Sequence, residues 1–208
     1  MAGRRFPTTG CIGIALLGLV STAARGKELQ PTSFPAKYSM ELDPGDISTV
    51  KACAIAGPVT IHDSRDDTPV GERAREKTPT VRHPIKMTGD AAEWVRAGFN
   101  ELARQSAFQN GVAGKPDVTV ALADVRIVEM VYRMAEYHGR VVLDISVIAP
   151  GGGSCWSERV EGFAENYGRA GKEVNYQETV NHALDRAFAK TFGTLAFVDA
   201  LCSCGGSP

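Results

Sequence analysis

The sequence has almost no net charge. Its 208 residues include 23 Lys and Arg against 24 Asp and Glu, a formal charge of -1. Because phosphate binding needs a basic excess or a basic face, this balance argues against nucleic acid as the main partner. Hydrophobic residues make up 43% of the chain and charged residues 23%, which is ordinary for a globular protein. We therefore expect one domain with its own core.

The sequence also has no hydrophobic run of the roughly 20 residues that a transmembrane helix needs. Its apolar run covers residues 11–20, after Arg4 and Arg5 and before the small residues 21–24. This order of charged, apolar and small residues is typical of a cleaved export signal. We expect residues 1–24 to be the signal and favour this over a buried N-terminal helix.

Two variants of export remain open. The Arg pair fits a twin-arginine signal, but Phe6 and Pro7 follow it, so the general secretory route is favoured. Residues 9–11 look like the end of a lipobox, yet the apolar run follows Cys11 instead of preceding it. We therefore expect a periplasmic or secreted protein rather than an outer-membrane lipoprotein, with membrane association left open.

Catalytic motifs are missing too. The sequence holds no G-x-S-x-G elbow and no H-E-x-x-H zinc motif. The glycines at 151–153 precede an expected strand, which favours a hairpin over a phosphate cradle. Its densest polar cluster is the loop from His62 to Asp67. His62 and Asp63 should point to opposite faces of an extended chain, which favours a solvated turn with a local Asp–Arg pair. We predict no enzyme activity, no cofactor and no metal site.

Five cysteines are present, and Cys11 would leave with the signal. Cys53, Cys155, Cys202 and Cys204 remain, an even number suited to an oxidising compartment. Disulfides are favoured over free thiols, and free thiols over a metal site. Four cysteines allow three pairings, and the sequence does not choose among them.

Hydrophobic periodicity predicts an α+β domain. Strands are expected at residues 52–62, 118–127, 141–147 and 156–164, and helices at 90–108 and 176–192. The order β-α-β-β-β-α predicts an antiparallel or mixed sheet of about four strands with two helices on one face. Residues 25–50 read as a linker, residues 51–197 as the domain and residues 198–208 as a Cys- and Gly-rich tail.

One segment stands out as a candidate partner surface. Met130, Tyr132, Met134 and Tyr137 follow the expected strand at 118–127, whose alternation could continue through them. Methionine and tyrosine suit an adaptable binding face, although simple sheet packing explains them as well. A nearby edge strand could also accept a strand from a partner.

The arrangement resembles a known bacterial group. The segment from Val59 to Arg65, an early helix and the stretch from Tyr132 to Phe192 look like the YajG-like family of envelope lipoproteins. They also look like the accessory lipoproteins of lipid-transport ABC systems. The resemblance covers roughly residues 55–193 and implies an α+β envelope protein of uncharacterised role. It supplies no catalytic residues, and the missing lipobox is a departure.

The leading hypothesis is therefore an exported envelope accessory or interaction protein that binds a protein or a lipid. Two alternatives remain: a small-ligand carrier with a pocket between sheet and helices, and a hydrolase centred on the loop from His62 to Asp67. The oligomeric state stays undetermined.

Overall fold

The computed structural model describes residues 29–41, 53–66, 68–105, 109 and 111–204. The expected signal at 1–24, part of the expected linker, and Asp67 lie outside these residues. Within them, no helix is long and apolar enough to span a bilayer.

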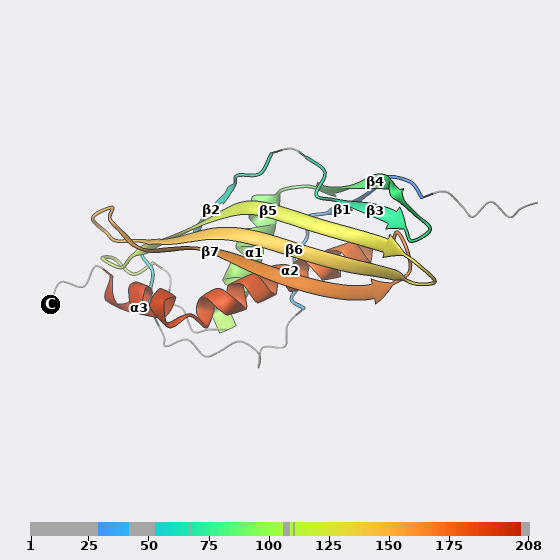
Figure 1. Cartoon of the computed structure of the whole chain (residues 1–208). Helices are drawn as coiled ribbons and strands as arrows, with labels where there is room; N and C mark the ends of the chain where they lie inside the picture. Colours follow the sequence, from blue (N-terminus) through green and yellow to red (C-terminus); the bar gives the residue numbers. More distant parts are fainter. Residues whose placement is uncertain (1–28, 42–52, 67, 106–108, 110, 205–208) are drawn as a thin grey trace, which may run out of the picture.

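A seven-stranded mixed sheet forms one layer of the fold (Figure 1). Its order is β1-β4-β3-β5-β6-β7, and β2 pairs with β5 beside that path. The long strands β5, β6 and β7 are antiparallel, whereas β2 and β3 both run parallel to β5 and share its other edge. The strands are β1 (Thr32–Pro35), β2 (Thr60–Asp63), β3 (Gly71–Arg75), β4 (Thr78–Thr88), β5 (Asp117–Val131), β6 (Ala135–Ile148) and β7 (Ser154–Gly168).

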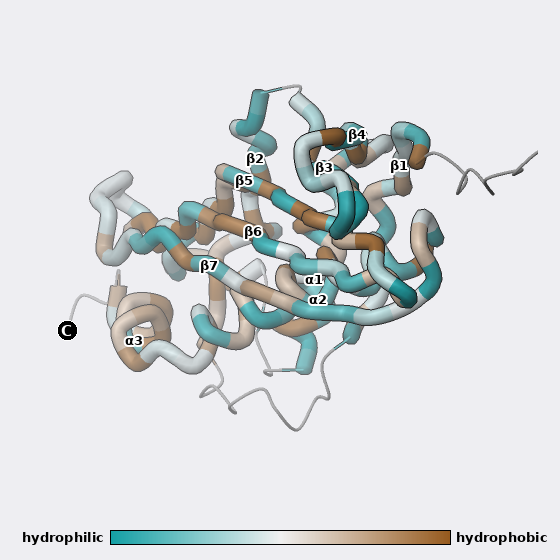
Figure 2. The backbone as a smooth tube through the Cα atoms, turned by 45° about the vertical axis from the view of Figure 1, so that its right-hand side comes forward, coloured by the Kyte–Doolittle hydropathy of each residue, from teal (hydrophilic) through white to brown (hydrophobic). Residues whose placement is uncertain are grey.

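Three helices cover one face of this sheet, as Figure 1 shows. They are α1 (Ala91–Gln105), α2 (Glu173–Phe192) and α3 (Leu195–Ser203). Phe99 of α1 packs edge-on against Phe188 of α2, with ring centroids 5.6 Å apart. Brown segments run along β5, β6 and α3 in Figure 2, and the buried residues of these elements belong to the core. Burial of these side chains is the main stabilising term.

The sequence forms these elements because its apolar residues match their periods. In β6, Val141, Leu143, Ile145 and Val147 are fully buried under the helices, while the residues between them are mostly less buried. Helix α1 begins as predicted, since the backbone N–H of Glu93 donates to Asp90 Oδ1 at 3.0 Å.

The start of α2 was predicted wrongly. The helix begins at Glu173, and its N-cap Lys172 makes no side-chain capping bond. Asn175, which directly precedes the predicted helix start at residue 176, lies inside the helix and donates to the carbonyl oxygen of Arg169 at 3.0 Å. The side chain of Asn175 therefore attaches the loop that precedes the helix.

The other sheet face carries charged pairs instead of helices. Arg140 contacts Asp124 at 3.1 Å and Glu161 at 2.6 Å, and Arg159 contacts Asp144 at 2.7 Å. These residues belong to three neighbouring strands, so opposite charges alternate across the sheet. Such exposed pairs add little stability each, but they keep this face polar.

The α+β class is confirmed, but the expected count of about four strands and two helices is too low. Strand β1 lies in the segment read as a linker, and β3 and β4 lie in the polar stretch after residue 63. They are short or exposed and lack a clear apolar alternation, so periodicity does not reveal them. Helix α3 extends from the domain into the expected tail.

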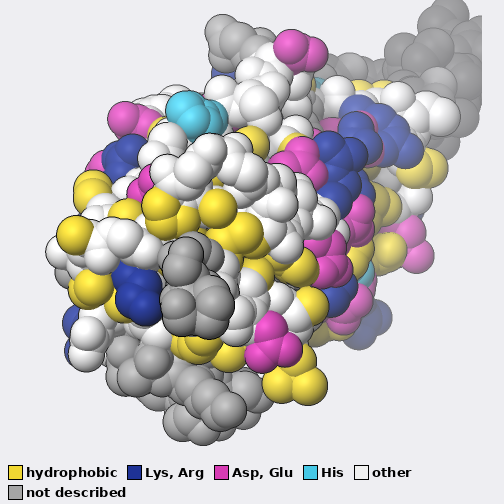
Figure 3. Space-filling view, turned by 90° about the vertical axis from the view of Figure 1, so that its left-hand side faces the viewer, with side chains coloured by type: hydrophobic (Ala, Val, Ile, Leu, Met, Phe, Trp, Pro, Cys, Tyr) yellow, Lys and Arg dark blue, Asp and Glu magenta, His cyan; other side chains and the backbone are white. Residues whose placement is uncertain are grey.

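Helix α3 closes one end of the molecule. Its Phe197 packs on Trp156 of β7 and Phe192 of α2, with ring centroids 5.1 and 5.7 Å apart. Figure 3 faces this end and shows hydrophobic side chains gathered across its middle, with most of the charged ones toward one side. The hairpin turns of the sheet that join β3 to β4 and β5 to β6 lie at the opposite end (Figure 1).

Close packing of α2 on β7 depends on Gly162. A Cβ atom at this position would meet the backbone of Ala183 and Ala187. Gly162→Ala should therefore push the helix from the sheet and lower the free energy of unfolding by about 3 kcal/mol, the upper range for overpacking. Urea denaturation measures this loss. Gly153→Ala is the matched control because a Cβ there meets nothing within 4 Å; equal effects of the two variants would contradict the packing argument.

Candidate functional site

A buried carboxylate, Glu129 on β5, lies near the end of the sheet opposite α3. It is opposite Arg73 in the parallel pairing of β3 with β5, and opposite Tyr137 in the antiparallel pairing of β5 with β6. The three side chains therefore form one row on the face beneath the helices. Glu129 and Tyr137 are fully buried and Arg73 is 7% exposed.

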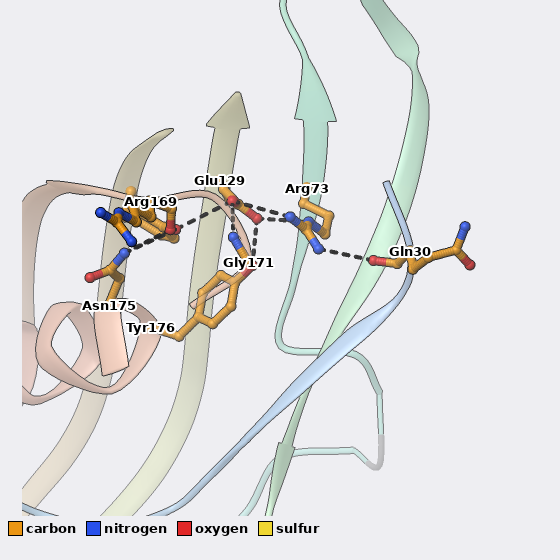
Figure 4. A network of polar contacts seen from close by, with 8 residues as sticks. Gln30, Arg73, Glu129, Arg169, Gly171, Asn175 and Tyr176 are labelled. Carbon is orange, nitrogen blue, oxygen red and sulfur yellow. Dashed lines mark hydrogen bonds and ion pairs between the residues drawn. The ribbon is translucent and has the colours of Figure 1, made fainter. Parts of the chain in front are cut away.

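Several donors surround the Glu129 carboxylate (Figure 4). Arg73 Nε lies 2.7 Å from Oε2, and the hydroxyl of Tyr176 on α2 donates to the same oxygen. The backbone N–H of Gly171 donates to Oε1 at 2.8 Å. Tyr137 lies 3.3 Å from Oε1 through its hydroxyl, which is closer, at 2.7 Å, to the carbonyl oxygen of Arg169. Both oxygens of this buried carboxylate therefore have hydrogen-bond or ion-pair partners, as a buried polar group requires.

This Glu129 network joins segments that are far apart in sequence. Arg73 Nη1 also donates to the carbonyl oxygen of Gln30 at 3.1 Å, which attaches the chain before β1. Gly171 and Arg169 belong to the loop between β7 and α2, so the same contacts fix that loop. Because the Glu129 carboxylate joins β3, α2 and the β7–α2 loop, the network holds this end of the sheet in shape.

The tyrosines of the network give a pH dependence. Burial, followed by the hydrogen bond to Glu129, raises the pKa of Tyr176, and burial raises the pKa of Tyr137. A tyrosine whose pKa is raised in the folded state stabilises the fold fully below its ordinary pKa near 10 and loses that contribution as the pH rises further. The free energy of unfolding should therefore fall above about pH 10.

Tyr176→Phe tests this dependence. The variant is less stable at neutral pH because a hydrogen bond to a carboxylate is lost, yet its stability should fall less steeply with alkaline pH. Urea denaturation at a series of pH values measures how steeply the free energy of unfolding falls with pH in the wild type and in the variant. Tyr132→Phe, at an exposed position, should leave the slope unchanged. If the free energy of unfolding depends on pH in the same way in the wild type and in Tyr176→Phe, Tyr176 is not a source of the alkaline loss of stability.

Beyond the network the chain forms an exposed surface, which we call the basic tip. Its members share the turns and strand ends at this end of the sheet: Lys77, Tyr132, Arg133, Met134, Tyr167 and Arg169. Met134 and Tyr167 are 61% and 60% exposed, and Tyr132 is 45% exposed. Exposed groups of this kind mark contact surfaces when they cluster.

The structure divides the four residues predicted to bind a partner. Tyr132 and Met134 lie on the basic tip, and Met130 is half-buried on the open sheet face. Tyr137 is fully buried, so its assignment to a partner surface was wrong. The irregularity between Leu122 and Asp124 shifts the inward-facing positions from even to odd numbers, and Tyr137 therefore points to the helices. Arg133, Tyr167 and Arg169 were missed; the pairing of Tyr167 with Glu136 across the β6–β7 hairpin is the signal that places it there.

The polar loop after β2 has the geometry of a local turn. Arg65 donates to both carboxylate oxygens of Asp63 at 2.8 Å, and these bonds lower the pKa of Asp63. Asp63 therefore orients Arg65 rather than His62. A hollow of about 280 Å³ separates this loop from β5 around Asp124 and Arg126. The Asp–Arg pair is as predicted, and no base–acid pair forms between His62 and Asp63.

All four remaining cysteines form disulfides. Cys53 pairs with Cys202 and Cys155 pairs with Cys204, which selects one of the three pairings. Both bonds attach the C-terminal end of α3 to the rest of the fold. The described part of the chain contains no group of three or more His, Cys, Asp or Glu residues that could hold a metal ion.

Comparison with known proteins gives a likeness of fold only. No family model matches the sequence, and no curated protein matches it. The crystal structure of protein XCC0632 from Xanthomonas campestris, assigned to family DUF330, aligns with a TM-score of 0.50 and 8% identity. The alignment covers 80% of this chain and 95% of that chain. An uncharacterised protein aligns with a TM-score of 0.29 and 8% identity over 81% of this chain and 97% of its own.

Proposed function

We propose that this chain is an exported cell-envelope accessory protein that binds a protein or lipid partner through its basic tip and has no catalytic activity. The single observation that carries the proposal is the cluster of exposed Tyr132, Met134 and Tyr167 at one end of the sheet. Folding leaves these large apolar side chains in water, so the free energy of their burial is available to a partner that covers them.

The supporting arguments come from the rest of the molecule. Two disulfides fit an oxidising compartment such as the bacterial envelope. The fold is shared with an uncharacterised bacterial protein, in line with the resemblance to envelope lipoprotein families. The Glu129 network fixes the backbone near the tip residues. Little conformational entropy is therefore lost when a partner binds.

Site-specific photo-crosslinking in cells tests the proposal. A photoreactive residue at position 134 should crosslink to one envelope component, either a protein or a lipid, that is the same in repeated preparations. The matched control is position 195, because Leu195 is 78% exposed on α3 at the opposite end. Equal crosslinking at both positions, or none at position 134, would remove the basis for a binding tip.

A further inference from the structure

Three shallow grooves meet at the basic tip around Val131. The first lies between the β3–β4 and β5–β6 turns and includes Lys77 and Arg133. The second, of about 410 Å³, lies between the β5–β6 turn and the β7–α2 loop and includes Arg133 and Arg169. The third borders Leu29, Arg73 and Gly171. Each groove therefore has arginine or lysine in its wall.

The charge on these walls is one-sided. The described residues that line the three grooves include the cations Arg73, Arg75, Lys77, Arg133 and Arg169, and Glu76 is their one acid. Arg73 is occupied by Glu129 and Gln30, whereas Lys77, Arg133 and Arg169 are exposed. The walls of the three grooves thus carry an excess of positive charge, which fits an anionic partner.

The apolar side chains distinguish an anionic surface from a free anion. Tyr132 and Met134 protrude beside Arg133 on a turn, and Tyr167 lies on the neighbouring strand end. A free phosphate would leave these side chains in water. The boundary between lipid headgroups and acyl chains takes up both kinds of side chain, since aromatic rings prefer that depth and cations meet the phosphates.

The path of the chain points the same way. Leu29 borders the third groove, and Gln30 is bonded to Arg73. The segment that precedes Leu29, which contains the apolar residues 11–20, therefore joins the domain beside the tip. Until the expected cleavage of that segment, this end of the domain would lie nearest the membrane.

We propose that the basic tip docks on an anionic membrane surface, with its cations on lipid phosphates and with Tyr132, Met134 and Tyr167 among the headgroups. This inference rests on the proposed function and specifies its partner. A membrane is favoured over a protein partner for the following reason. Separate cationic grooves around protruding apolar side chains suit many independent lipid headgroups better than one folded protein surface.

Vesicle sedimentation of the exported and processed protein tests the charge. Binding to vesicles of phosphatidylglycerol mixed with phosphatidylcholine should exceed binding to pure phosphatidylcholine and weaken with added salt. The triple variant Lys77→Glu/Arg133→Glu/Arg169→Glu should bind about 100-fold more weakly, because each cation near such a surface contributes on the order of a fivefold factor. The matched control Lys37→Glu/Lys86→Glu/Lys190→Glu has the same net charge and changes exposed side chains away from the tip.

Tryptophan fluorescence tests the orientation independently. Met134→Trp should shift its emission to the blue on vesicles that contain phosphatidylglycerol, because the indole leaves water. Leu195→Trp, at the opposite end, should not shift. Both positions are exposed, so both variants should fold, and an unchanged near-UV circular dichroism spectrum verifies this.

The outcomes separate this inference from the proposed function. Equal binding to both vesicle types, equal losses in the two triple variants, or a shift at position 195 alone would overturn membrane docking. If position 134 then crosslinks to an envelope protein, the tip still serves as a binding site and the membrane is the wrong partner. If crosslinking fails as well, both proposals fall.

Discussion

Replacing Glu129 with alanine is expected to lower the free energy of unfolding by about 3–5 kcal/mol, the range for breaking a buried ion pair from one side. The change leaves the guanidinium of Arg73 buried without its carboxylate, and the N–H of Gly171 and the hydroxyl of Tyr176 without their acceptor. Each unsatisfied buried group adds its own desolvation cost. Urea denaturation at neutral pH measures the loss.

The matched comparison removes both charges. Glu129→Leu/Arg73→Leu should recover a large part of the stability, since a buried ion pair often contributes no more than apolar side chains of similar volume. Asp124→Ala, which removes an exposed partner of Arg140, should cost under about 1 kcal/mol. If Glu129→Ala costs as little as Asp124→Ala, the network is not what fixes this end of the sheet.

The same variant should loosen the β7–α2 loop. Hydrogen exchange at the amide of Gly171 should speed up in Glu129→Ala, because that amide loses its bond to Oε1. Exchange in the middle of β6 should change only as much as the global stability does. A faster exchange at Gly171 than in the middle of β6 would show that the buried network fixes the loop beside the basic tip.

Sequence periodicity predicted the long elements well. The alternation in β6 and the helical stripe of α2 depend on burial against one another, and both lie where the pattern places them. Strand β1 escaped prediction because the strand that pairs with it lies far away in sequence. β1 pairs with β4 although more than forty residues separate them in the chain, a relation that local composition does not encode.

At the candidate site, prediction of the strand alternation from local sequence fails. Val118, Val120 and Leu122 face the helices, but the irregularity between Leu122 and Asp124 shifts the alternation by one residue. From there Val125, Ile127 and Glu129 face inward, and Met130 turns to the open face. An even-numbered pattern continued past Leu122 would place Met130 on the helix side, where Glu129 lies instead. With the correct alternation for β5, Glu129 would have stood out as an acid in a row of buried apolar residues.

Removing the Cys53–Cys202 disulfide should cost about 3–5 kcal/mol, because this bond closes a loop of 149 residues in the unfolded chain. The double variant Cys53→Ser/Cys202→Ser avoids a stray thiol. Helix α3 has nine residues and could not persist alone, so its position over Trp156 depends on this bond and on its packing. Denaturation without reductant measures the loss.

The second disulfide tests whether these bonds stabilise the fold by restricting the unfolded chain. Cys155–Cys204 closes a loop of 49 residues, so Cys155→Ser/Cys204→Ser should cost roughly 1 kcal/mol less than the other double variant if chain entropy dominates. Both bonds attach to α3, so their effect on its position should be alike and only the loop lengths differ. A larger loss from the shorter loop would show that the bonds act mainly by holding α3 in the folded state. A wild type that keeps its full stability in strong reductant would contradict both disulfides.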